Sequence, residues 1–274
     1  MAGSFKLYDY SPSGAAAMIF VAAFTAATLW HAFVVFQKRS WYFCAFLVGG
    51  IFEITGYVAR FISSSDETNI LPFVLQSIFI LVAPALFAAS VYMILGRLIL
   101  YLGAEELSPV RPRWLTKIFV GGDVLSFLVQ VLGSGMLSNA KTTGTGQTVI
   151  LVGLVIQILF FGVFIIATVI FHRRYVQSGM DLRRGPQPRH SRIGWKQIIL
   201  VQYLASGLIF IRSLFRLIEY AQGKDGVLMT SEVFLYLFDS VLMLGVMVAL
   251  LFYHPTKLLP RKKDMMALRD MDSQ

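Results

Sequence analysis

Seven long apolar runs, each able to cross a lipid bilayer, constrain this chain more than any other feature. A spanning helix needs about 20 consecutive, predominantly apolar residues. Charged residues make up only 14% of the chain, against about 25% in soluble domains. The sequence therefore predicts an all-α, polytopic membrane protein with seven transmembrane helices, near residues 14–36, 41–62, 72–102, 115–138, 147–171, 197–219 and 232–253.

These spans occupy most of the 274 residues and predict the domain organisation. We expect a short extracellular head at 1–13, a transmembrane domain at 14–256 and a basic cytoplasmic tail at 257–274. The first apolar run is too long for the core of a cleaved signal peptide, so we expect it to be retained. Cys44 is the only cysteine, which excludes an intrachain disulfide.

The basic residues predict how the helices are oriented. Sorted by alternate connections and termini, 16 Lys and Arg fall on one side of the membrane and 3 on the other. Because basic residues concentrate in cytoplasmic segments, this places the N-terminus outside and the C-terminus in the cytoplasm. Orientation accounts for the net charge of +9, and we expect no nucleic-acid partner.

Charged residues inside the predicted spans are the best candidates for function. A charge at the bilayer centre costs about 2.5–3.5 kcal/mol on insertion scales, so it needs a partner, a water-filled cavity or a role. With the predicted orientation, three helices carry charges on one stripe each, in the outer half of the membrane, where the stripes can face one another. We expect either a structural ion-pair network or a polar cavity that binds substrate, formed by Glu53, Arg60, Arg212, Arg216, Glu219, Glu232 and Asp239.

A second polar face is predicted on the fourth span. Asp123 lies in its inner part and Gln130 follows seven residues later, which is about two helical turns. We interpret the two as an inner polar station. On the third span, Pro84 removes an intrahelical hydrogen bond and is expected to form a kink or hinge.

The polar positions, read in order, also form a recognisable pattern. It includes E-x-x-G-Y-x-x-R at 53–60, A-P-A at 83–85, R-x-x-F-R-x-x-E at 212–219, E-x-x-x-Y-x-x-D at 232–239 and H-P at 254–255. This pattern resembles the fungal lipid-translocating exporter family, also called the aminocholesterol-resistance or RTA-like family, over about residues 45–260. The first helix carries less of the resemblance.

The resemblance implies a function for the chain. It suggests a multi-pass protein of the fungal plasma membrane that exports or translocates amphipathic, lipid-like molecules such as sphingoid long-chain bases, and that contributes to resistance to toxins. Expected partners are membrane lipids and an amphipathic small-molecule substrate. An amine head group would suit a cavity with an excess of carboxylates. We expect no enzymatic activity and no cofactor.

Two other functions remain open at this stage. Seven helices with an outside N-terminus also describe a lipid or stress sensor that regulates other lipid transporters. A zinc-dependent intramembrane lipid hydrolase is the third interpretation, because His31, His172, His254 and Asp123 are expected near the cytoplasmic side. The sequence lacks an H-E-x-x-H motif, a phosphate-binding G-x-x-x-x-G-K-[ST] loop and a lysine in the last span that would bind retinal.

Overall fold

The computed structural model describes residues 13–65, 70–136, 143–180, 194–223, 228 and 232–255. Within these ranges the fold is all-α, with no strand, as the sequence predicts. The first five spans are α1 (Gly14–Lys38), α2 (Cys44–Ser65), α3 (Ile70–Tyr101), α4 (Pro112–Met136) and α5 (Thr143–Gln177). The sixth is α7 (Trp195–Gln222), and the seventh comprises α9 (Glu232–Leu235), the π-helix η3 (Tyr236–Ser240) and α10 (Val241–Phe252).

All seven spans are long and apolar enough to cross a membrane. Two short 3-10 turns, η1 (Trp41–Phe43) and η2 (Glu105–Leu107), lie in the connections. The expected head and tail lie outside the described residues except for Ser13. The orientation across the membrane and the three-part division of the chain stay predictions.

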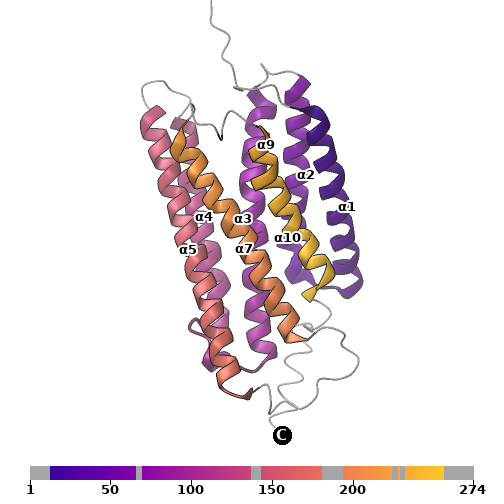
Figure 1. Ribbon diagram of the computed structural model, residues 1–274, viewed down its shortest axis with the longest axis vertical. Helices are drawn as coiled ribbons and strands as arrows, with labels where there is room; N and C mark the ends of the chain where they lie inside the picture. The colour runs from indigo at the N-terminus through magenta and orange to yellow at the C-terminus, as the bar shows by residue number, and fades with distance from the viewer. Residues whose placement is uncertain are drawn as a thin grey trace, which may run out of the picture.

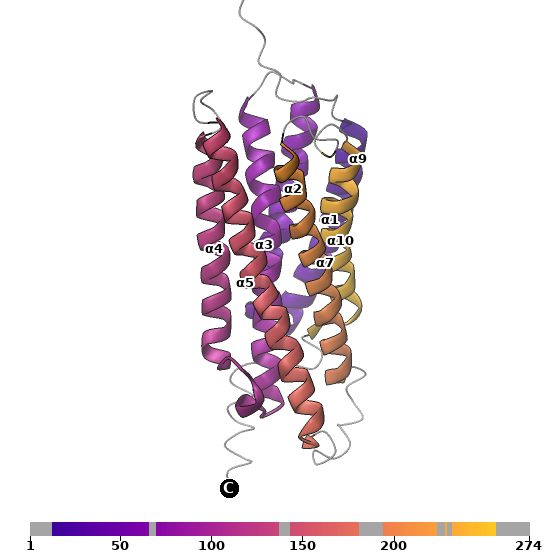
Figure 2. The ribbon, with the colours of Figure 1, turned by 60° about the vertical axis from the view of Figure 1, so that its left-hand side comes forward.

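The helices form an elongated bundle with α3 and α7 in the middle (Figures 1 and 2). On one side α1, α2 and α10 pack together, and on the other α4 packs against α5. Because α3 contacts α2, α4 and α7, it joins the two halves of the bundle. Polar groups on α3 can therefore reach partners on either side.

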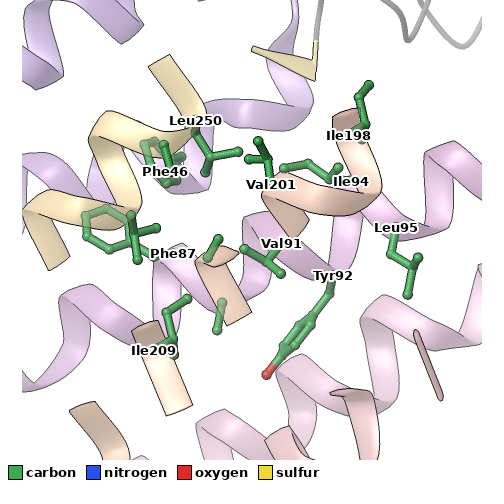
Figure 3. Close-up of a cluster of buried hydrophobic side chains, with 14 of the residues drawn as sticks. Phe46, Phe87, Val91, Tyr92, Ile94, Leu95, Ile198, Val201, Ile209 and Leu250 are labelled. Carbon is green, nitrogen blue, oxygen red and sulfur yellow. The ribbon is translucent and has the colours of Figure 1, made fainter. Parts of the chain in front are cut away.

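Apolar side chains divide between the interior and the outer surface of this bundle. Backbone groups inside a bilayer must be satisfied within the protein, and α-helices achieve this whatever faces the lipid. Buried aliphatic and aromatic residues fill the centre, where residues of α2, α3, α7 and α10 meet (Figure 3). Large apolar side chains cover the outside and suit contact with lipid, among them Ile19, Phe33, Leu71, Leu132, Leu159, Leu200 and Val233.

Small residues on α2 let its backbone approach two neighbouring helices. A Cβ added at Gly49 or Gly56 would collide with side chains of α3, and one at Gly50 would collide with Thr28 of α1. Such close packing is how helices commonly associate in membranes. It fixes the position of α2 along the very stretch that carries Glu53.

Candidate functional site: a buried ionic network

Asp239 is the centre of a buried set of ion pairs. Its Oδ1 accepts from Arg212 Nε at 2.7 Å and its Oδ2 accepts from Arg216 Nη2 at 2.8 Å. Arg216 Nη1 also donates to Glu219 at 2.9 Å. Asp239 therefore pairs with two arginines of α7, and one of these arginines also pairs with Glu219 on the same helix. We call the seven residues predicted for the polar cavity the ionic network: Glu53, Arg60, Arg212, Arg216, Glu219, Glu232 and Asp239.

A second ion pair lies at the end of the bundle where α1, α3, α5 and α9 begin. Arg60 Nη2 donates to Glu232 Oε1 at 2.7 Å, and Arg60 Nε donates to the hydroxyl of Tyr236 at 3.2 Å. The backbone N–H of Ser13 also donates to both oxygens of Glu232, at 2.9 and 3.1 Å. The start of α1 is thereby held against the start of the seventh span.

The π-helix η3 places Asp239 within reach of α7. A π-turn contains an extra residue, which shifts the faces of the helix, and such turns are frequent at functional sites. Asp239 and Ser240 are adjacent in sequence, yet both are buried. Ser240 Oγ forms a hydrogen bond with the hydroxyl of Tyr57 on α2. The irregular turn therefore directs two consecutive polar side chains into the bundle, towards two different helices.

Pro84 supplies the network with a backbone acceptor. Proline has no N–H, so the carbonyl four residues earlier, that of Ile80, loses its usual intrahelical donor. Arg212 Nη2 donates to this carbonyl at 3.1 Å. Arg212 is thus bound both by Asp239 and by α3, and its side chain is fully buried. The predicted hinge at Pro84 stays a prediction, since α3 continues as an α-helix through this residue.

Glu53 is the network carboxylate that lacks an ion pair among the described residues. It is 1% exposed, and its Oε1 has no hydrogen-bond partner. Arg212 and Arg216 are close enough to interact with it electrostatically. Both also have a buried N–H group without a partner, Arg212 Nη1 and Arg216 Nε. Hydrogen-bonding capacity therefore remains open in the middle of the network.

Aromatic rings of α1, α2 and η3 stack beside these charges. The ring of Phe20 is 5.2 Å from that of Tyr236 between centroids and 5.7 Å from that of Tyr57. Phe24 stacks on Tyr57 at 5.5 Å. The set of site residues predicted from the sequence did not include these aromatic residues. The tyrosines had a signal, because Tyr57 follows Glu53 by four residues and Tyr236 follows Glu232 by four, and residues four apart share a helix face. No charged residue of α1 lies at such a spacing from Phe20 or Phe24, so these two rings had no comparable signal.

The second predicted polar station is a separate site on α4. Asp123 Oδ2 accepts from the hydroxyl of Tyr92 on α3 at 2.9 Å, and Gln130 Nε2 donates to Gln157 Oε1 on α5 at 3.1 Å. We call these four residues the α4 junction. Tyr92 lies about 18 Å beyond Ile80 along α3 at ~1.5 Å per residue. Its hydroxyl points away from the neighbouring aliphatic side chains (Figure 3).

The three histidines considered for zinc lie in two places. His31 Nε2 bonds to the backbone carbonyl of Met247, and its ring lies 5.4 Å from that of His254. His172 instead bonds to Tyr203 on α7 through Nδ1. In the described ranges no three His, Cys, Asp or Glu side chains are grouped so that they could hold a metal ion.

One further cation, the half-buried Arg97, was not among the predicted site residues. The guanidinium group of Arg97 on α3 lies 3.9 Å from the ring centroid of Tyr42 in η1. Cation–π contact explains how this charge is accommodated between the two segments. In the sequence, the only indication of this contact was that Arg97 lies between apolar residues near the end of a span.

Comparison with known proteins gives a consistent family assignment. The model of the family described as RTA1 like protein matches residues 46–262. Protein RTM1 of Saccharomyces cerevisiae is 43% identical over 74% of this chain, but the match spans 63% of that relative, less than two thirds of its length. Protoporphyrin uptake protein 1 of the same species is 34% identical, covering 89% of this chain and 90% of the relative.

A more distant relative has a name that states a lipid substrate. Sphingoid long-chain base transporter RSB1 of Saccharomyces cerevisiae is 27% identical over 82% of this chain and 67% of the relative. No solved structure matches the chain.

Proposed function

Since the chain belongs to the RTA1 like protein family, we propose that it translocates amphipathic, lipid-like molecules across a membrane, and that the ionic network binds their head groups. The observation that carries this proposal is the open hydrogen-bonding capacity of buried charged groups. A purely structural network would be expected to satisfy its members, because an unpaired buried charge is costly. Glu53, Arg212 and Arg216 each retain an unused polar atom.

The arrangement of helices suits this role. Functional charges inside membranes usually face the bundle interior and pair with one another. The network joins α2, α7 and η3, which belong to three different spans, so a head group that binds there can alter contacts between all three. The hydrocarbon chain of the substrate can remain in lipid, beside the apolar outer faces of these helices.

The name of one relative, sphingoid long-chain base transporter RSB1, supports a lipid-like substrate, and sphingoid long-chain bases are our first choice. We propose that the molecule crosses chemically unchanged, that the protein acts at the plasma membrane, and that the end of the bundle at which α1 begins faces outward. The last proposal rests on the bias of basic residues. Single-cysteine labelling of intact cells at position 13, in a Cys44→Ser background, tests the orientation and the location together.

The decisive experiment measures movement of a labelled long-chain base in liposomes that contain the purified protein. We expect wild-type protein to move the label, mass spectrometry to recover it intact, and Asp239→Asn to lose activity. Glu106→Gln, which neutralises an exposed carboxylate in η2, is the matched control and should behave as wild type. Saturable binding without movement would contradict translocation and indicate a lipid sensor instead.

A further inference from the structure

Among the network carboxylates, only Glu53 is without a matched cation in the described part of the chain. Arg60 is matched by Glu232, and the two arginines of α7 are matched by two carboxylates. Glu53 therefore carries the surplus negative charge whenever it is ionised. A buried carboxylate in this state needs a cation, either a proton or a ligand.

The surroundings of Glu53 define where such a cation would bind. Glu53 lies on the face of α2 that packs on α3, between Gly49 and Gly56, which contact Ala83 and Ile80 respectively. The Ile80 carbonyl is also the acceptor for Arg212. The carboxyl group consequently lies at the junction of α2, α3 and α7, where the network meets the backbone freed by Pro84.

The charged and titratable groups that act on Glu53 come from three elements. Arg212 and Arg216 of α7 and Asp239 of η3 interact with it electrostatically, and on α2 itself Tyr57 does so. Among the described residues, no charged side chain of α1 or α3 interacts electrostatically with Glu53. The two arginines are paired with Asp239 and Glu219, so neither is the dedicated counter-ion of Glu53.

From this geometry we propose that Glu53 is a cation-exchange site: it holds a proton in the absence of substrate and releases that proton to water when the ammonium group of a long-chain amine binds in its place. The inference rests on the proposed function and names its substrate class. An ammonium group donates to the Glu53 carboxylate. A hydroxyl beside the amine accepts from Arg212 Nη1 or Arg216 Nε, which fits an amino-alcohol head group.

Anionic head groups fit the same place less well. A carboxylate or phosphate would lie beside Glu53 and Asp239, which are both acidic. It could find donors only in the open N–H groups of arginines that are already neutralised. Like charges at short distance in a buried site cost several kcal/mol. The site therefore selects amines over fatty acids of equal chain length.

The test is calorimetric binding of hexadecylamine to the purified protein in nanodiscs of neutral lipid, with hexadecanol and hexadecanoate as matched probes. Titration in two buffers of different ionisation enthalpy reports the protons released. We expect about one proton per bound amine, and an affinity that rises from pH 5 to 8 because protons compete for the same group. Preference for hexadecanoate over the amine would overturn the proposal.

Glu53→Gln supplies the second arm. We expect amine binding to weaken roughly 30-fold, and proton release and pH dependence to disappear. Glu53→Asp, which keeps a carboxyl group, should retain proton release and shows whether the effect follows the charge rather than folding; thermal melting verifies that both variants fold. Wild-type binding with undiminished proton release in Glu53→Gln would exclude Glu53 as the exchange site.

The two proposals can fail separately. If the wild type moves lipid in liposomes and Glu53→Gln does so with the same pH dependence, the exchange site is wrong while translocation stands. If amine binding releases a proton but no lipid moves, translocation is wrong while the exchange site stands.

Discussion

The ionic network and the α4 junction bury polar groups in the same bundle by different means. In the network, opposite charges from α2, α7 and the seventh span pair directly, with Asp239 shared by two arginines. At the junction, the Asp123 carboxylate accepts one hydrogen bond from a phenol within the described residues, and the amide of Gln130 donates to that of Gln157. A carboxylate or a guanidinium group has several hydrogen-bonding positions, so charged residues of the network can exchange one partner for another. The hydroxyl and amide groups of the junction have fewer such positions, which suits them to holding helices together.

A buried polar residue in a membrane helix therefore indicates its role only together with the groups that it binds. α3 takes part in both regions, through the Ile80 carbonyl in one and the hydroxyl of Tyr92 in the other. In the network, the carbonyl of α3 accepts from Arg212, whose Nη1 has no hydrogen-bond partner among the described residues. We therefore expect changes in the network to affect transport and changes at the junction to affect stability.

Asp239→Asn should have the largest effect. The amide leaves two buried arginines without their shared counter-charge, and removing one partner of a buried pair costs about 3–5 kcal/mol. We expect loss of transport and a lower melting temperature in detergent. Asp123→Asn is the matched change at the junction and should cost less; equal losses in both variants would remove the distinction between the two regions.

Tyr92→Phe should separate stability from transport. The change deletes the hydroxyl that donates to Asp123 and leaves a buried acid without this partner, at a cost of about 1–3 kcal/mol. We expect the protein to melt earlier while liposomes retain most of the wild-type rate of lipid movement. A variant that keeps its melting temperature but loses transport would place the junction on the substrate path.

Pro84→Ala tests the link between α3 and the network. Alanine restores the N–H that binds the Ile80 carbonyl within the helix, so this donor competes with Arg212 for the acceptor. The competition should weaken the hydrogen bond from Arg212, worth about 1.5 kcal/mol, while α3 gains an intrahelical hydrogen bond. We expect slower transport with nearly unchanged melting. Unchanged transport would show that the freed carbonyl is dispensable.

The smallest effect is expected for the amide pair of the junction. Gln130→Leu and Gln157→Leu should each destabilise by leaving one amide unsatisfied, and the double variant should recover part of the loss. Interhelical hydrogen bonds in membranes couple by about 0.6 kcal/mol on average. A double-mutant cycle on thermal unfolding measures this term. A coupling as large as that between Arg212 and Asp239 would contradict the contrast drawn between the two regions.

Much of the fold could be predicted because its determinants are local. The seven helices occupy the seven apolar runs. The π-helix was not predicted, since nothing in the five residues Tyr236–Ser240 excludes an α-helix. The stability of this π-helix relative to an α-helix depends on the hydrogen bonds and ion pairs that Asp239 and Ser240 form with other helices.

The positions of the seven spans along the chain, and the charges that they carry, follow from the sequence, because insertion into lipid depends on the composition of each segment. Which groups pair follows from how the helices pack. Arg60 binds a glutamate 172 residues away, and Arg212 binds a backbone carbonyl 132 residues away that has no side-chain signature. Pairing follows from the distances between packed helices, so the three-dimensional arrangement alone reveals that Glu53 is the network carboxylate without an ion pair among the described residues.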